Sequence, residues 1–366
     1  MRTVRGYAEP MLHDSGAFPM VIGHRGASGY RPEHTRSAYE LAFALGADAV
    51  EPDIVATRDG VLVLRHENEI SGTTDVASRP EFASRRTTRD VDGTALTGWF
   101  TEDFTWAELS TLRAKERLGS LRQSSASFDG RYPILRLRDL FELIDTAAEE
   151  QRRLVRMVAE FKHASHFAAI GLPLDELFAA ELDDAGWDRG GERLIMESFE
   201  LDVLDRLGAR GIRGHRVFLV EATGSPLDVV QSVGEAAPTY DAYVTEAGLL
   251  GLAGRVHGVS VGKARLLAAP RGGARAPNGS LRSHSRTATL VGADLVDAAH
   301  SAGLRVFTWT LRPENRFLSA AHRRGGSRAA FGDWMGEFEQ VIATGVDGIF
   351  VDHPDLGVEA RRAMGG

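Results

Sequence analysis

Residues 20–55 read MVIGHRGASGYRPEHTRSAYELAFALGADAVEPDIV and decide the fold of this chain. An apolar run at 20–24 is followed by an amphipathic stretch at 36–45 and by a second apolar run at 49–55. Gly46 directly follows the amphipathic stretch, where a helix commonly ends in a left-handed cap. A strand, a helix and a second strand in this order are typical of a parallel α/β fold.

The same unit recurs along the whole chain. Further strands are predicted at 61–66, 154–161, 194–198, 217–221, 258–262, 306–310 and 348–352. Further helices are predicted at 106–113, 138–149, 174–185, 201–208, 291–302 and 333–344, several of them ending at a glycine. This repetition predicts the α/β class and, within it, a TIM (β/α)8 barrel.

The predicted strands number nine, whereas such a barrel has eight places. The strands at 49–55 and 61–66 are joined by a turn too short for a crossover helix. Either this pair departs from the regular unit or one strand lies outside the barrel. We expect an N-terminal extension at 1–18 and one barrel domain at 19–360. Within it we expect a small inserted subdomain at about 67–135 and a long mobile loop at about 264–289.

Composition excludes several classes of site. The chain has 366 residues and no cysteine, which excludes disulfides, thiolate zinc sites and a cysteine nucleophile. Its net charge of −8 argues against a nucleic-acid partner. No signal-peptide pattern and no apolar run long enough for a membrane span is visible, so the expected location is the cytoplasm. The oligomeric state stays open.

Two carboxylates share one face of the strand at 49–55. Glu51 and Asp53 are two positions apart, so their side chains leave the strand in the same direction. Such carboxylates repel each other unless a cation or a proton intervenes. A polar stripe facing outward is the alternative, but a strand covered by helices makes a site for a hard divalent cation the better interpretation.

Polar side chains also end the neighbouring strands. His24 ends the first strand and Arg25 follows it, His66 ends the third, and Glu160 and Lys162 share a face at the end of the fourth. Active sites of TIM barrels lie at the carboxyl ends of the strands. A His–Arg pair can simply cap a strand, but the recurrence at four consecutive strands favours a functional site.

These side chains suggest metal-assisted cleavage of a phosphate ester. The three acids offer an all-oxygen cation site. The cation, together with Arg25 and Lys162, would neutralise the charge that builds up on the phosphate. Two histidines with pKa values near 6.5 could divide the proton transfers between a base and an acid.

At these residues the sequence resembles the glycerophosphodiester phosphodiesterases, a family of TIM-barrel enzymes. The match comprises HRGASGYRPEHT at 24–35, the spacing to Glu51 and Asp53, the TRDG turn at 57–60, and His66. Weaker matches follow in the family's order: YPIL at 132–135, AEFK at 159–162, SF at 198–199, TWT at 308–310 and GVDGIFVDHPD at 345–355. The stretch GYRPEHT with the following TTDVA looks like the longer, periplasmic-type bacterial branch, although no signal peptide is visible.

The resemblance implies hydrolysis of a small glycerophosphodiester to sn-glycerol 3-phosphate and an alcohol such as choline, ethanolamine or glycerol. It also implies roles for individual residues: His24 as base and His66 as acid; Glu51, Asp53 and Glu160 as ligands of one Ca2+ or Mg2+; Arg25, Lys162 and Trp309 as substrate-binding residues; and Glu33 as a support of the site. Glu67 stands where the family usually has Asp, which moves this carboxylate by one methylene.

Two other functions remain open at this stage. The same barrel could carry a lysophospholipase D or phospholipase-C-like phosphodiesterase, for which we expect an apolar rim at the mouth. A catalytically silent binding protein would also keep the fold. The presence of both histidines and all three acids speaks against the silent protein.

Overall fold

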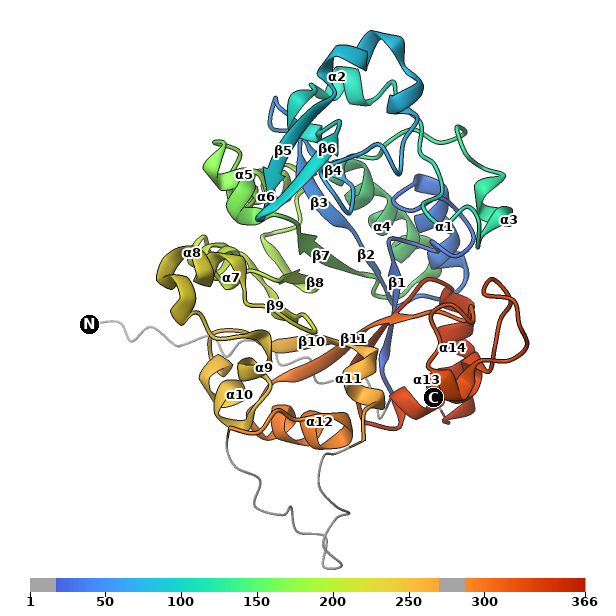
Figure 1. The fold of residues 1–366 in the computed structure, drawn as a ribbon, viewed down its shortest axis with the longest axis vertical. Helices are drawn as coiled ribbons and strands as arrows, with labels where there is room; N and C mark the ends of the chain where they lie inside the picture. The colour runs from blue at the N-terminus through green and yellow to red at the C-terminus, as the bar shows by residue number, and fades with distance from the viewer. Residues whose placement is uncertain (1–17, 270–286, 366) are drawn as a thin grey trace, which may run out of the picture.

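The computed structural model describes residues 18–269 and 287–365. In these residues eight parallel strands close into a barrel, in which β2 pairs with both β1 and β7 (Figure 1). The barrel strands are β1 Met20–His24, β2 Ala49–Glu51, β7 Arg156–Phe161, β8 Gly190–Ser198, β9 Arg213–Val220, β10 Gly258–Gly262, β11 Arg305–Leu311 and β12 Gly348–Val351. The predicted TIM barrel is therefore confirmed.

The predicted strand at 61–66 is the one that lies outside the barrel. The predicted strand at 49–55 is interrupted at Pro52, which has no backbone N–H, and continues as β3 Asp53–Ala56. Both parts pair with β7 in one register, so β3 extends beyond the rim of the barrel. There β4 Leu62–Leu64 pairs antiparallel with β3, because the turn between them has no room for a helix.

A small apolar cluster fills the interior of the barrel: Met20, Ile22, Ala49, Val158, Ile195, Val217, Phe307 and Phe350. Side chains alternate along a strand, so the residue two positions after an inward-facing residue also faces inward. His24 follows Ile22 in this way, Glu51 follows Ala49, and Glu160 follows Val158. The carboxyl end of the barrel is therefore polar inside, above an apolar floor.

Helices cover the outside of the barrel and enclose a second, larger apolar core. They are α1 Arg36–Ala44, α4 Leu137–Gln151, α5 Ala164–Ala169, α6 Leu174–Asp184, α7 Leu201–Ala209, α8 Leu227–Val233, α9 Tyr240–Tyr243, α10 Glu246–Leu252, α11 Lys263–Leu267, α12 Gly292–Ser301, α13 Trp334–Ile342 and α14 Pro354–Ala363. The helices α5, α8, α9, α10, α11 and α14 were not predicted, because most of them are too short for a helical period to show.

The inserted segment stands beside β3 and β4, at the top of Figure 1. It contains a two-stranded antiparallel sheet of β5 Thr87–Val91 and β6 Thr94–Gly98, the helices α2 Trp106–Leu109 and α3 Gln123–Ala126, and short 3-10 turns. The helix predicted at 106–113 is thus shorter than expected. The predicted loop at 264–289 begins within α11, and its residues 270–286 lie outside the described residues.

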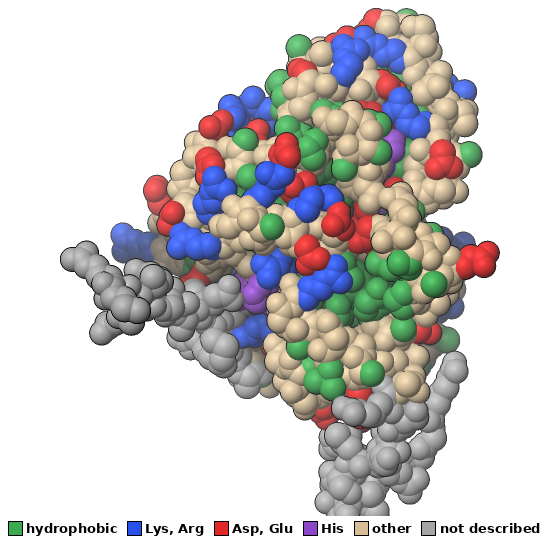
Figure 2. All heavy atoms as spheres, turned by 90° about the vertical axis from the view of Figure 1, so that its left-hand side faces the viewer, with side chains coloured by type: hydrophobic (Ala, Val, Ile, Leu, Met, Phe, Trp, Pro, Cys, Tyr) green, Lys and Arg blue, Asp and Glu red, His purple; other side chains and the backbone are tan. Residues whose placement is uncertain are grey.

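On the face shown in Figure 2, basic and acidic side chains are interspersed next to an area of hydrophobic side chains. No single sign of charge dominates this face. Over the described ranges, no helix has the length and apolar character needed to cross a membrane.

Candidate active site

Three buried carboxylates meet at the carboxyl end of the barrel. Glu51 ends β2, Asp53 begins β3, and Glu160 lies on β7 directly beside Asp53. One oxygen of each lies within 4.8 Å of the other two, and the most exposed of these residues, Glu160, is 7% exposed. Burial and the charge of Asp53 raise the pKa of Glu51 well above its usual range. The sequence-predicted acid triad is therefore brought together.

A fourth carboxylate, which the sequence reasoning missed, lies next to this triad. Glu197 on β8 pairs in register with Glu160 and is 2% exposed. Its Oε2 atom has no hydrogen-bond partner, and neither does Oδ1 of Asp53. Burial and the neighbouring charge of Glu160 raise the pKa of Glu197 well above its usual range. Its position two residues after the inward-facing Ile195 was the signal that could have found it.

The residues present fit a divalent cation. Several carboxylates are crowded into a buried space, and two of their oxygens lack a partner. Hard cations such as Ca2+ and Mg2+ take oxygen ligands of this kind, and a cation would remove the mutual repulsion. Glu51, Asp53 and Glu160 are the residues that would hold it.

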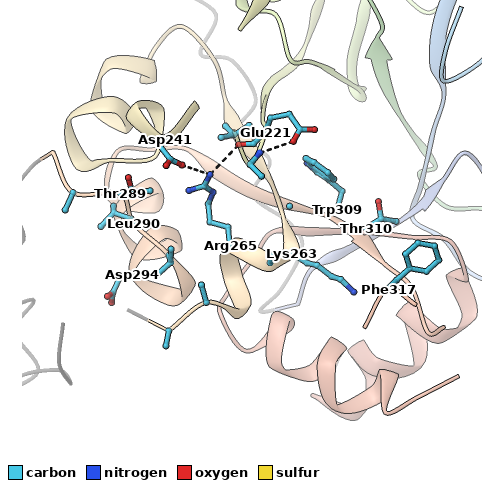
Figure 3. Close-up of a pocket in the computed structure, with 18 of the residues that line it drawn as sticks. Glu221, Asp241, Lys263, Arg265, Thr289, Leu290, Asp294, Trp309, Thr310 and Phe317 are labelled. Atoms are coloured by element: carbon cyan, nitrogen blue, oxygen red, sulfur yellow. Dashed lines mark hydrogen bonds and ion pairs between the residues drawn. The ribbon is translucent and has the colours of Figure 1, made fainter. Parts of the chain in front are cut away.

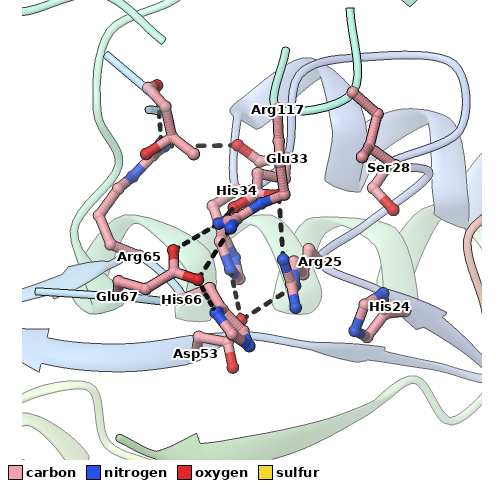
Figure 4. Close-up of polar contacts among 12 residues, drawn as sticks. His24, Arg25, Ser28, Glu33, His34, Asp53, Arg65, His66, Glu67 and Arg117 are labelled. Carbon is pink, nitrogen blue, oxygen red and sulfur yellow. Dashed lines mark hydrogen bonds and ion pairs between the residues drawn. The ribbon is translucent and has the colours of Figure 1, made fainter. Parts of the chain in front are cut away.

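Arg25 follows β1 in a tight turn, and its side chain points toward Asp53 (Figure 4). Its φ of 58° is left-handed, and the next residue, Gly26, has a φ of 85°. The backbone N–H of Arg25 donates to Glu51 Oε2 at 2.7 Å. Its guanidinium contacts Glu33 at 3.0 Å and Asp53 at 3.1 Å. The turn thus aims a fixed positive charge at the centre of the site.

The imidazole of His24 is oriented by an acid from the other end of the chain. Its Nδ1 lies 2.6 Å from Oδ1 of Asp352, which follows β12. Burial and the neighbouring Arg25 lower the pKa of His24 to about 4, so the imidazole is neutral at pH 7. Burial disfavours the charged form of Asp352, but Arg312 and Arg122 hold the pKa of Asp352 well below its usual range. With Nδ1–H donated to this carboxylate, Nε2 is left for chemistry.

His66 reaches the same site although it does not end a barrel strand. The sequence predicted that His66 ends the third strand of the barrel; this prediction is wrong, because β4 lies outside the barrel. Because β4 runs antiparallel to β3, it returns the chain toward the rim at the level of Asp53, where Arg65 N–H donates to the Asp53 carbonyl at 3.0 Å. His66 Nδ1 lies 2.5 Å from Oε1 of Glu67, and its Nε2 lies 3.3 Å from the Nζ of Lys162.

Burial and the charges of Arg25 and Lys162 lower the pKa of His66 to about 3. The lysine ammonium can only donate, so Nε2 of His66 accepts and Nδ1 carries the proton that Glu67 accepts. Lys162 also donates to Glu160 Oε1 at 2.7 Å. Glu67, although one methylene longer than the Asp that the family usually has at this position, thus still contacts His66.

Glu33 and His34 complete the polar network from the loop before α1. Glu33 accepts from Arg25 and from Arg117 of the inserted segment. His34, which is fully buried, contacts Asp53 Oδ2 through Nε2 at 2.9 Å and the hydroxyl of Tyr39 through Nδ1 at 2.8 Å. Glu33 lies where the sequence placed it as a support, whereas the contact of His34 with Asp53 was not predicted.

Trp309 on β11 lines a cavity of about 780 Å³ beside the acid site (Figure 3). Its ring lies edge-on to Phe199, with 5.9 Å between the centroids, and the Nζ of Lys162 lies 5.7 Å from the centroid of Phe199. Glu221 and Arg265 also line the cavity, together with small apolar side chains that include Ala268 and Leu290. Trp309 is thus next to the polar site but not in the network of Figure 4.

Taken together, the arrangement can stabilise an anion and move protons on two sides of it. Two neutral imidazoles each have a carboxylate at Nδ1; His24 lies near the charge of Arg25, and His66 lies near the charges of Arg25 and Lys162. All the residues predicted for base, acid and cation binding lie in this one place. Their individual roles stay predictions.

Comparisons with known proteins agree with this arrangement. Residues 24–356 match the sequence pattern of the glycerophosphoryl diester phosphodiesterase family. The chain is 30% identical over 351 residues to a glycerophosphodiester phosphodiesterase of Arabidopsis thaliana, and the match covers 91% of this chain and 83% of that protein.

Two solved structures share the fold. One, from Silicibacter pomeroyi, carries the same family name and has a TM-score of 0.64 at 21% identity over 96% of this chain and 95% of that chain. The other is a phosphodiesterase of Oleispira antarctica in complex with its product sn-glycerol-3-phosphate. It has a TM-score of 0.55 at 18% identity over 94% and 96% of the two chains. At these identities the structures speak for the fold alone.

Proposed function

The chain belongs to the glycerophosphoryl diester phosphodiesterase family, whose members are phosphoric diester hydrolases, and we propose that it hydrolyses glycerophosphodiesters to sn-glycerol 3-phosphate and an alcohol. The observation that carries this proposal is the pair of carboxylate-oriented imidazoles on His24 and His66 beside a buried triad of acids. A phosphodiester needs charge neutralisation at its oxygens and proton transfer at two of them, and this site offers both.

The cation site is part of the proposal. A divalent cation on Glu51, Asp53 and Glu160 would supply a Lewis acid for the phosphate oxygens. The chain's own positive groups, Arg25 and Lys162, are held in place by the same acids and would bind the remaining phosphate oxygens.

The two histidines divide the proton transfers in this proposal. His24 donates Nδ1–H to Asp352, and its Nε2 takes the proton of the nucleophile, which is water or the neighbouring glycerol hydroxyl. His66 acts as the acid in the substrate complex, where the negative charge of the bound phosphate favours uptake of a second proton at Nε2 from the solvent; the ring then gives this proton to the leaving oxygen, while Glu67 stabilises the doubly protonated form at Nδ1. The assignment of base and acid follows the family resemblance.

A direct assay tests the proposal. Purified protein is incubated with glycerophosphocholine and Ca2+ or Mg2+, and released glycerol 3-phosphate is measured. We expect turnover that disappears with a chelator and in the variant His24→Ala. No turnover of glycerophosphocholine, glycerophosphoethanolamine or glycerophosphoglycerol would overturn the proposal.

One observation favours a second candidate. The cavity beside Trp309 is lined by Ala264, Ala268, Ala269 and Leu290, which provide part of the apolar rim that a lysophospholipid would need. Turnover of lysophosphatidylcholine without turnover of any glycerophosphodiester would establish this activity instead. Binding of either compound without turnover would indicate a silent binding protein.

A further inference from the structure

Both histidines of the site are connected, through their carboxylate partners, to one short segment of the insertion. Glu67 orients His66 and Asp352 orients His24. Each of these two carboxylates is in turn bound by an arginine from the segment 115–122, which lies between α2 and α3.

Arg117 binds two carboxylates at once (Figure 4). It donates to Glu67 from Nη1 at 2.8 Å and from Nη2 at 2.6 Å, and to Glu33 from Nε at 2.8 Å and from Nη2 at 2.7 Å. Glu33 also accepts from Arg25. Arg117 therefore connects the carboxylate behind His66 with the carboxylate behind the phosphate-binding arginine, two groups that would otherwise repel each other.

Arg122 does the same for the other histidine. Its Nη2 donates to Oδ2 of Asp352 at 2.6 Å, its Nε to Glu314 at 2.7 Å, and its Nη1 to the carbonyl of Ser28 at 3.1 Å. Because Oδ2 of Asp352 is occupied by Arg122 and by Arg312, Oδ1 is left to face His24.

The segment itself is fixed to the rest of the insertion. Lys115 N–H donates to the Thr73 carbonyl at 2.9 Å, and Glu116 accepts from Ser125 Oγ at 2.5 Å and from Leu118 N–H at 2.8 Å. Because these hydrogen bonds fix the backbone of the segment, its arginines lose little conformational freedom when they bind a carboxylate. They can therefore define the position of that carboxylate.

We propose that Arg117 and Arg122 are positioning residues: through Glu67 and Asp352, the inserted segment sets the orientation of both histidines. The proposal rests on the proposed function, in which these histidines transfer protons. It gives the insertion a part in the chemistry, because β1 and the hairpin of β3 and β4 supply the histidines, whereas Arg117 and Arg122 come from the insertion. Arg312, which follows β11, assists Arg122 at Asp352.

Arg117 allows a matched experiment. The test variant is Arg117→Gln, with Arg117→Lys as the conservative variant. The control is Arg85→Gln, because Arg85 also lies in the insertion, has the same side-chain exposure of 29%, and also binds a glutamate through two nitrogens, but its partner Glu108 is remote from the histidines. All variants are compared by thermal unfolding so that a loss of fold is detected.

The first readout needs no substrate. In protein labelled with 15N-histidine, an Nδ1 proton held by a carboxylate gives a downfield resonance, and the variants His24→Gln and His66→Gln assign the two signals. We expect Arg117→Gln to shift or broaden the His66 signal and to leave that of His24 in place. Arg85→Gln should leave both unchanged. An unchanged His66 signal in folded Arg117→Gln would overturn the proposal for Arg117.

Arg122→Lys tests the other half by the same readout. We expect it to move the His24 signal and not that of His66, and an unchanged His24 signal in folded protein would overturn the proposal for Arg122. Lysine keeps the charge of this buried residue but cannot reach three acceptors in one plane.

The second readout is kinetic. With glycerophosphocholine, Arg117→Gln should lose about 10- to 100-fold in kcat, as supports of active-site groups do, with KM within about threefold of the wild-type value. Arg117→Lys should recover part of the loss, and Arg85→Gln should match the wild type. An equal kcat in Arg117→Gln would contradict the proposal. If the wild-type protein turns over no glycerophosphodiester, the proposed function fails. The Nδ1–H signals of His24 and His66 still test whether Arg117 and Arg122 orient the two histidines.

Discussion

The Nδ1 atom of His24 and Oδ1 of Asp352 lie 2.6 Å apart although 328 positions separate the two residues in the chain. They meet because β1 and β12 are neighbours in the closed barrel, with Gly23 opposite Val351. Closure of the barrel therefore creates the pair that orients the proposed base.

The variant His24→Gln should lose about 10²- to 10⁴-fold in kcat with glycerophosphocholine, because a general base contributes this much to catalysis. The control is His300→Gln on α12, whose side chain is 43% exposed and pairs with Asp347 away from the site. It should keep wild-type kcat. Steady-state kinetics on both proteins makes the comparison, and a loss of less than about fivefold in His24→Gln would refute its role as base.

Removal of divalent cations should abolish turnover and lower the melting temperature. A ligand that binds only the folded state adds about 2.7 kcal/mol at 100 times its Kd. Differential scanning calorimetry with chelator, Ca2+ or Mg2+ measures this stabilisation. Asp53→Asn should lose it, whereas Asp184→Asn, whose side chain is 71% exposed, should retain it. Equal stabilisation of the wild-type protein and Asp53→Asn would place the cation elsewhere.

The stability of the metal-free protein should carry a pH signature of Glu160. Burial and the charge of Asp53 raise the pKa of Glu160 from 4.5 to about 7, although Lys162 acts in the opposite direction. Between these pH values the folded state retains a proton that the unfolded chain has released, so Glu160 costs stability as the pH rises.

We expect Glu160→Gln to gain stability relative to the wild type between pH 4.5 and about 7, by on the order of 3 kcal/mol in total. Urea unfolding of both proteins in the presence of a chelator measures this difference. The buried histidines, whose pKa values are lowered, make stability rise with pH, but they do so in both proteins, so their contribution cancels in the difference. Added Ca2+ should reverse the sign, because only the wild-type carboxylate can bind it. A difference that does not change with pH would rule out the raised pKa.

Gly26→Ala should destabilise the protein by about 2 kcal/mol or more, because a Cβ at this position would lie 2.6 Å from the carbonyl carbon of Ala38 and the φ of 85° is left-handed. Gly171→Ala separates the two causes. Gly171 has a similar φ of 78°, but a Cβ there meets nothing within 4 Å. Chemical denaturation should show a clearly smaller loss for Gly171→Ala, and equal losses would show that the close contact with α1 is unimportant.

The barrel could be predicted from the sequence because its strands are short apolar runs and its helices repeat a local period. The hairpin of β3 and β4 could not be placed, since periodicity shows that a strand exists but not which neighbour it pairs with. Only the common register of β2 and β3 on β7 shows that the strand resumes after Pro52 and extends beyond the rim of the barrel.

The candidate site was predictable where its residues stand at strand ends, as His24 and Glu160 do. Asp352 was missed although it ends the predicted strand at 348–352. Arg117 and Arg122 were missed because their contacts join distant segments of the chain, and no local pattern distinguishes them from surface charges. Glu197 was missed because a single acid near the end of the strand predicted at 194–198 has no second acid beside it in the sequence. Its position two residues after Ile195 places it on the inward face, and the register with Glu160 shows which acid it meets there.

The hairpin of β3 and β4, with the insertion beside it, makes the mouth of the barrel asymmetric (Figure 1). The hairpin extends the sheet above β2 and β7, next to the acids Glu51, Asp53 and Glu160. The cavity of about 780 Å³ opens elsewhere, at the ends of β9, β10 and β11. A diester whose phosphate lies against Arg25 and Lys162 would therefore have one of its two organic groups on the side of this cavity, next to Trp309. Differences in substrate preference among such barrels would then arise from residues at the ends of β9, β10 and β11. The residues over β2 and β7 would stay unchanged.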